Sequence, residues 1–358
     1  MRKARWLATL KNSPSGSVGT KPAIYHCISR VVDRRFVFEK REREAFRMFM
    51  RMYENFSGCQ VLSYCVMSNH FHILLEVPPS AESGIADKEL LKRLSAIYSE
   101  SFTSEIMKQL STARADGNEH QVAEIHRRFT YRMHDLSQFM KGLLIRFTRW
   151  FNRTHSRTGT LWEERFRSVI VESGIATRTI AAYIDLNPVR AGMVSDPADY
   201  RWSSYGEAIG GGKKGNGKTA RAGLVRAYFC DQEVASDPEK WREVSRSYRR
   251  LMSFAIEKYS GRKAVEKTGK LVTQNTAEML AAEDNQTVLQ DLTVAKLLHC
   301  RVRYFTDGAV IGSREFVNEA FTNARERFGT KRKDGARKLR GSGRAAAGLI
   351  WSMRDLRV

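Results

Sequence analysis

Long apolar runs are missing from this chain of 358 residues, and no uninterrupted stretch approaches the roughly 18 residues that a membrane-spanning helix needs. The basic N-terminal stretch MRKARWLATLKNSPSGS lacks the apolar segment and the small-residue cleavage site of a signal peptide. These absences argue against a membrane or secreted class. We expect a cytoplasmic protein in which residues 1–22 form a flexible basic arm.

Cysteines are few, odd in number and widely spaced, and no CxxC pair is present. Disulfide frameworks and structural zinc sites need paired cysteines at short or regular spacing. The sequence therefore predicts reduced, mostly buried thiols at Cys27, Cys59, Cys65, Cys230 and Cys300.

Acidic residues are also scarce, with 39 Asp and Glu against 61 Lys and Arg, which gives a formal charge of +22. Such an excess indicates a polyanionic partner, and nucleic acid is the commonest one. No amphipathic segment with aromatic anchors points to a lipid surface. The stretch GNGK has no preceding strand and no GK[ST] ending, so it does not predict a phosphate-binding loop.

Hydrophobic periodicity predicts an α+β fold, with an antiparallel sheet and helices packed on it. The expected strands are 23–29, 59–67, 70–77 and 166–173, and the expected helices are 39–56, 135–155 and 174–187. We divide the chain into a catalytic domain at 23–209 with a helical insert at 80–134, a Gly/Lys-rich linker at 210–223 and a mainly helical, basic C-terminal region at 224–358. Within that region we expect residues 329–344 to be a flexible cationic arm.

The stretch SNHFHILLEV raises a question of chemistry, because it begins with two histidines one residue apart. Side chains alternate along a strand, so His70 and His72 share one face while Phe71 takes the other. Two imidazoles about 7 Å apart along a strand can bind one cation. The alternative is a pair of half-exposed or hydrogen-bonded histidines without a ligand.

A second group lies in AAYIDLNPV, where Tyr183 and Asn187 are four residues apart and share a helix face. A helix packed on the histidine face would bring the phenol, the amide oxygen and the imidazoles together. Such a set suits a divalent metal, Mg²⁺ or Mn²⁺, that polarises a phosphate for attack by the phenol. The product would be a covalent phosphotyrosine.

The blocks YHCISRVVDRRFVF, YCVMSNHFHILLE, TGTLWEERFRSVIVES and YIDLNPVRAGMV resemble, in order, those of REP-associated tyrosine transposases. These enzymes belong to the HUH single-tyrosine superfamily, which cuts and rejoins single-stranded DNA. The resemblance covers about residues 23–205 and implies a ferredoxin-like HUH endonuclease fold. It implies that His70 and His72 are metal ligands and that Tyr183 is the nucleophile. Asn187 falls where related transposases carry a glutamine as the third ligand.

Several residues are candidates for DNA contacts through phosphate binding and base stacking. The alternative for each is ordinary surface charge or, for the tryptophan, a buried core residue. The candidates are Arg30, Arg34, Arg35, Arg149, Arg153 and Trp162.

Three functions stay open at this point. The first is a metal-dependent endonuclease and strand transferase on single-stranded or hairpin DNA from palindromic repeats. The second is a cleavage-silent DNA-binding protein of the same fold that acts in repeat recognition or regulation, and the third is an RNA-binding accessory protein. Relatives include both dimers that exchange active-site helices and monomers, so the homodimer is left open too.

Overall fold

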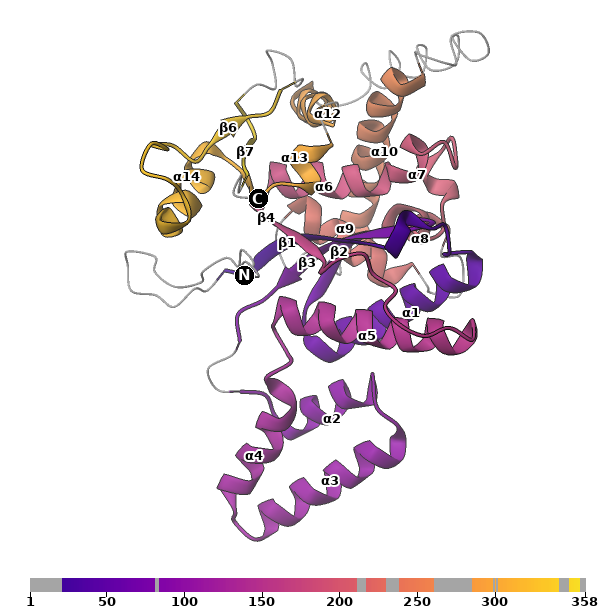
Figure 1. The fold of residues 1–358 in the computed structure, drawn as a ribbon, viewed down its shortest axis with the longest axis vertical. Helices are drawn as coiled ribbons and strands as arrows, with labels where there is room; N and C mark the ends of the chain where they lie inside the picture. Colours follow the sequence, from indigo (N-terminus) through magenta and orange to yellow (C-terminus); the bar gives the residue numbers. More distant parts are fainter. Residues whose placement is uncertain are drawn as a thin grey trace.

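One mixed sheet of seven strands runs through the described part of the chain (Figure 1), in the order β2-β3-β1-β4-β5-β7-β6. The computed structural model describes residues 21–80, 84–210, 217–229, 238–260, 285–298, 300, 302–340 and 348–354. The strands are β1 (Ala23–Arg30), β2 (Gln60–Val66), β3 (His70–Val77), β4 (Arg167–Val171), β5 (Val310–Gly312), β6 (Arg337–Lys338) and β7 (Trp351–Met353).

The first four strands form an antiparallel unit in which β1 lies between β3 and β4. Helix α1 (Lys40–Ser57) connects β1 to β2, and α5 (Leu136–Thr154) precedes β4. This βαββαβ order is the ferredoxin-like arrangement. The α+β fold expected from the sequence is therefore confirmed.

Local signals in the sequence fix the ends of these two helices. Glu39 and Glu42 form a reciprocal capping box at the start of α1, and Gly58 closes that helix with φ of 72°. At the start of α5 the Asp135 carboxylate accepts a hydrogen bond from the backbone N–H of Gln138.

The two faces of β3 carry different chemistry, as strand alternation predicts. Phe71 lies on one face, where its ring is 4.6 Å from the ring of Phe46 on α1. His72 lies on the other, where its ring is 5.7 Å from that of Tyr183 on α6 (Ile175–Asp185). Helices α1 and α5 thus cover the aromatic face, and α6 covers the histidine face.

The expected insert forms three helices that project away from the sheet (Figure 1): α2 (Asp87–Ser95), α3 (Glu100–Ala115) and α4 (Glu119–Thr130). They enclose a small hydrophobic core of their own, which includes Leu90, Ile106 and Phe129. The insert is joined to the sheet unit through Phe56 of α1, which belongs to this second core.

The prediction of a linker at 210–223 is wrong for its second half. Residues 211–216 lie outside the described part, but α9 (Lys218–Phe229) packs on β2. Arg226 of α9 forms a buried ion pair with Glu76 of β3, with 2.5 Å between Nη2 and Oε1. Gly223 brings the helix so close that an added Cβ would lie 2.4 Å from the carbonyl oxygen of Val61. Glycine here serves close packing rather than flexibility.

The C-terminal region is mainly helical, as expected, but it also contains three short strands that the sequence analysis did not predict. It contains α10 (Pro238–Ser260), α12 (Asn285–Leu297), α13 (Arg303–Thr306) and α14 (Arg314–Asn323), and it adds β5, β6 and β7 to the sheet. Strand β5 pairs in parallel with β4, so this region continues the catalytic sheet. One hydrophobic core runs from β1 to Met353 of β7.

The cationic segment 329–344 also differs from a free arm. Its described part, 329–340, contains β6, and Ala336 and Leu339 are buried. Arg332 donates hydrogen bonds to the backbone carbonyls of Gly335 and Arg354. The expected N-terminal arm spans residues 1–22, of which residues 1–20 lie outside the described part. Within the described residues, no helix has the combined length and apolar character needed to cross a bilayer.

Candidate active site

A pocket of about 430 Å³ opens where the N-terminal end of β3 meets α6. It brings together residues that are far apart in the sequence. All four residues predicted for catalysis or metal binding line it, together with two of the predicted DNA contacts: His70, His72, Tyr183, Asn187, Arg30 and Arg34.

The two histidine rings lie next to each other on β3, with 5.1 Å between their centroids. Asn69 orients the first one. Its Nδ2 donates to the backbone carbonyl of Arg34, so its Oδ1 faces His70 Nδ1 at 2.7 Å. An amide oxygen only accepts hydrogen bonds, so Nδ1 of His70 carries the proton and Nε2 keeps a free lone pair.

His72 is oriented by His26, a buried residue of β1 that the sequence interpretation missed. His26 Nδ1 lies 2.8 Å from the backbone carbonyl of Phe305, which can only accept, so Nδ1 carries the proton. In the neutral ring Nε2 of His26 is then an acceptor, and His72 Nδ1 donates to it over 3.0 Å. The Nε2 of His72 therefore also keeps a free lone pair.

Burial favours the neutral form of all three imidazoles. Desolvation lowers the pKa of His70 to about 4, and the nearby charge of Arg30 adds to this effect. Desolvation lowers the pKa of His26 to about 4 as well, against the opposing hydrogen bond to Phe305. The pKa of His72 lies well below its usual value because of burial first and then the neighbouring histidines and arginines. Neutral imidazole is the form that binds metals.

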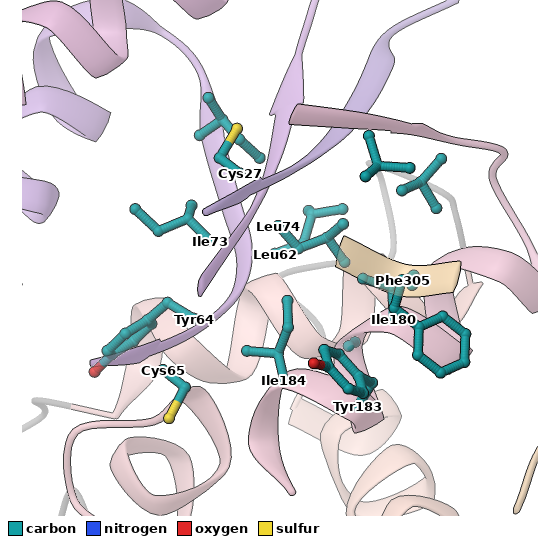
Figure 2. Close-up of a cluster of buried hydrophobic side chains, with 14 of the residues drawn as sticks. Cys27, Leu62, Tyr64, Cys65, Ile73, Leu74, Ile180, Tyr183, Ile184 and Phe305 are labelled. Atoms are coloured by element: carbon teal, nitrogen blue, oxygen red, sulfur yellow. The ribbon is translucent and has the colours of Figure 1, made fainter. Parts of the chain in front are cut away.

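Tyr183 lies over these histidines on α6, and its side chain is almost completely buried, at 1% exposure. Its ring is 6.0 Å from His26 and 4.9 Å from Phe305, which packs beside it in Figure 2. The guanidinium carbon of Arg190 lies 5.0 Å from the ring centroid. Arg190 belongs to α7 (Asn187–Arg190), and the sequence interpretation did not single it out.

Asn187 begins α7, just after the end of α6. Its Nδ2 donates to the backbone carbonyls of Tyr183 and Ile184, at 3.1 and 3.2 Å. Both amide protons are used in this way, so Oδ1 is the atom available as a ligand. An amide oxygen and imidazole Nε2 atoms are donors of the kind that bind divalent ions, and the three residues line the same pocket.

Three carboxylates also line the pocket, namely Glu163, Glu164 and Asp307, and the sequence interpretation missed all three. Asp307 comes from the C-terminal region and lies 3.5 Å from Arg167 of β4. Within the described residues, no group of three or more His, Cys, Asp or Glu side chains is placed to hold a metal ion. A metal site here therefore depends on Asn187 as well as the histidines.

The other predicted DNA contacts do not line this pocket. Arg35 is exposed and follows Arg34 in the chain. Arg149 and Arg153 are exposed on α5, which covers the opposite face of the sheet from Tyr183. These two arginines are therefore separated from the candidate site by the sheet.

Trp162 packs within an aromatic cluster and does not line the pocket. Its ring lies 5.5 Å from Phe71 and 5.9 Å from Phe38, and its N–H donates to Thr148 Oγ1 over 2.9 Å. Trp162 is partly buried, and these contacts pack its ring against the hydrophobic core. This packing is what the alternative of a core residue expects.

Comparison with known proteins supports the transposase class. The family model described as IS200-like transposase matches residues 20–114, and the resemblance seen in the motifs is confirmed over that part. The matched part contains His70 and His72 but neither Tyr183 nor Asn187. A solved structure of a REP-associated tyrosine transposase bound to a REP hairpin is similar with a TM-score of 0.35 and 13% identity, covering 53% of this chain and 81% of that one. No curated protein matches the chain.

Proposed function

We propose that this protein is a metal-dependent endonuclease and strand transferase for single-stranded DNA that folds into hairpins. Tyr183 is the nucleophile, and the reaction passes through a covalent 5′-phosphotyrosine. His70, His72 and Asn187 hold a divalent ion, Mg²⁺ or Mn²⁺. The hairpins come from palindromic repeats of the REP type.

The observation that supports this proposal most strongly is the orientation of the two histidines. Asn69 and His26 each engage an Nδ1 atom, so both Nε2 lone pairs are available in the same pocket as the phenol. A divalent ion in such a site polarises a phosphate and stabilises the charge that develops during its transfer. Histidines that were only structural would not need both free nitrogens in one polar pocket.

The protein's own residues would carry the remaining steps. Arg30 and Arg34 bind the phosphates that flank the reacting one. The Tyr183 oxygen forms a bond to phosphorus while the bond from phosphorus to the 3′ oxygen breaks. The phenol proton is lost to solvent or a base, and the 3′ oxygen leaves and takes up a proton. The phosphotyrosine keeps the bond energy for rejoining to another 3′ hydroxyl.

A second function follows from the burial of Tyr183. A phenol at 1% exposure, packed against Phe305, is poorly placed to meet a phosphate without a shift of α13. This observation favours a DNA-binding protein of the same fold that does not cleave. The same experiment separates the two functions.

The experiment uses the full-length protein and end-labelled hairpin DNA with single-stranded flanks, with and without Mn²⁺. A covalent protein–DNA band on a denaturing gel is expected only with the metal. Tyr183→Phe should lose the band and keep DNA binding, because the ring packing is unchanged. Tyr131→Phe, at a tyrosine 62% exposed on the insert, is the matched control and should keep it. A band in Tyr183→Phe excludes Tyr183 as the nucleophile, and no band in any protein supports the cleavage-silent function.

A further inference from the structure

A second hollow, of about 770 Å³, lies in the C-terminal region between α13 and the strands β6 and β7. We call it the C-terminal basic groove. In the described part of the chain its lining contains Tyr304 and Ser352, and the other lining residues are all Lys or Arg. No acidic side chain of the described residues lines it, although the first pocket, at the candidate active site, has three.

Among the described residues, most of these cations have no acidic partner. Lys331, Arg337 and Arg340 are exposed, and none of them forms an ion pair with another described residue. By contrast, Arg354 is within 3.9 Å of the Asp307 carboxylate, and Arg332 donates to backbone carbonyls. A concave surface with several unpaired cations attracts a chain of anions more strongly than a single one, because the charges act together.

The groove adjoins the candidate active site through one short helix. Val302, Thr306 and Asp307 line the first pocket, whereas Arg303 and Tyr304 line the groove. Helix α13 has four residues and is therefore about 6 Å long. A strand of nucleic acid that leaves the first pocket reaches the groove within a few nucleotides.

We propose that the C-terminal basic groove binds the sugar-phosphate backbone of the single strand that flanks the phosphate in the candidate active site. The groove is thus a second DNA-binding surface, built from residues outside the part that resembles a transposase. Its side chains offer cations and almost no base-reading groups, so it binds without regard to sequence. The inference rests on the proposed function only for the identity of the strand, since binding itself does not need cleavage.

The test measures binding of fluorescent oligothymidylates to the full-length protein over a range of salt concentrations. The triple variant Lys331→Gln/Arg337→Gln/Arg340→Gln removes three groove cations. The control Lys88→Gln/Lys108→Gln/Arg127→Gln removes three exposed cations from the insert, one from each helix. The net charge of the two variants is the same, and circular dichroism and thermal unfolding check that both remain folded.

For a long oligothymidylate, the groove variant should bind more weakly than wild type. Its plot of log K against log salt should be shallower by about 2 in slope, because each of three lost phosphate contacts on a single strand contributes about 0.7. The control should change much less. With an oligothymidylate too short to span both sites, the two variants should bind alike. Equal slopes for the long strand overturn the proposal, and so does a loss seen only with duplex DNA. If the wild-type protein forms no covalent adduct but the difference in slope is still seen, the proposed cleavage is refuted and the proposed groove is not.

Discussion

At the scale of single residues, His26 decides how His72 can act. The Phe305 carbonyl accepts a hydrogen bond from His26 Nδ1, which leaves His26 Nε2 as an acceptor for His72 Nδ1. His72 is therefore held in the tautomer whose Nε2 has a free lone pair. Its effect on a bound metal would be indirect, which makes it a positioning residue. Groups of this kind typically change metal affinity by 10- to 100-fold.

His26→Ala should therefore weaken Mn²⁺ binding by about 10- to 100-fold. Calorimetric titration of the protein with Mn²⁺ in the absence of DNA measures this directly. The control is His120→Ala, at an exposed histidine of the insert, which should bind the metal as wild type does. If a folded His26→Ala protein bound Mn²⁺ with unchanged affinity, His72 would not need the hydrogen bond to His26 to act as a ligand.

The buried histidines also make stability depend on pH. An unfolded histidine binds a proton below about pH 6.5, whereas folded His26 stays neutral down to about pH 4. The unfolded state thus binds more protons in this window, so stability is lost as the pH falls from 6.5 to 4. The loss from His26 is about 3 kcal/mol, at roughly 1.4 kcal/mol per pH unit.

Urea unfolding at pH 7 and pH 5 should show this decrease for wild type. His26→Gln should lose less stability between the two pH values, even though it is less stable overall, because one source of proton uptake has gone. His120→Gln should follow the wild-type curve. If His26→Gln were as pH-dependent as wild type, His26 would not be held neutral in the fold.

Several site residues could be predicted from the sequence because their chemistry is local. The spacing of His70 and His72 on a strand, and of Tyr183 and Asn187 at a helical turn, fixes which side chains share a face. His26 could not be found in this way. Its role depends on the carbonyl of a residue 279 positions away, which no local pattern encodes.

At the scale of elements, α9 shows how glycine can mislead a prediction. Composition made residues 210–223 look like a linker, but Gly223 lies in a helix and against the backbone of β2. The short strands β5, β6 and β7 were missed because runs of two or three residues carry no detectable alternation. Longer elements, such as α1 and α5, have apolar stripes and capping residues that sequence analysis can detect.

Gly223→Ala should therefore destabilise the protein, despite the better helix propensity of alanine. The new methyl group would meet the Val61 carbonyl at 2.4 Å and force α9 away from β2, at about 1–3 kcal/mol. Gly210→Ala, at the exposed end of α8 (Ser204–Gly210), meets no atom within 4 Å and is the control. Urea unfolding of both variants measures the difference, and equal stabilities would mean that α9 does not pack closely on β2.

At the scale of the whole molecule, the C-terminal region completes the catalytic sheet and does not form a separate tail. Strand β5 pairs with β4, and Phe305 packs on Tyr183. The position of Tyr183 in the candidate active site therefore depends on the folding of the C-terminal region. A domain boundary near residue 224, as the sequence suggested, would cut through one continuous core.

A chain that ends at residue 328 tests this continuity. It lacks β6 and β7, and it loses the buried side chains of Leu339, Ile350 and Met353. Each apolar side chain of this size contributes about 1.5–3 kcal/mol when buried, so the loss is a large fraction of the 5–15 kcal/mol of an ordinary domain. We expect a lower unfolding temperature and weaker adduct formation.

The groove variant Lys331→Gln/Arg337→Gln/Arg340→Gln should keep the wild-type unfolding temperature, because its changes are on the surface. If the shortened chain unfolds at the same temperature as the full-length protein, residues 329–358 do not contribute to the stability of the fold. The C-terminal basic groove would then not be part of the continuous hydrophobic core.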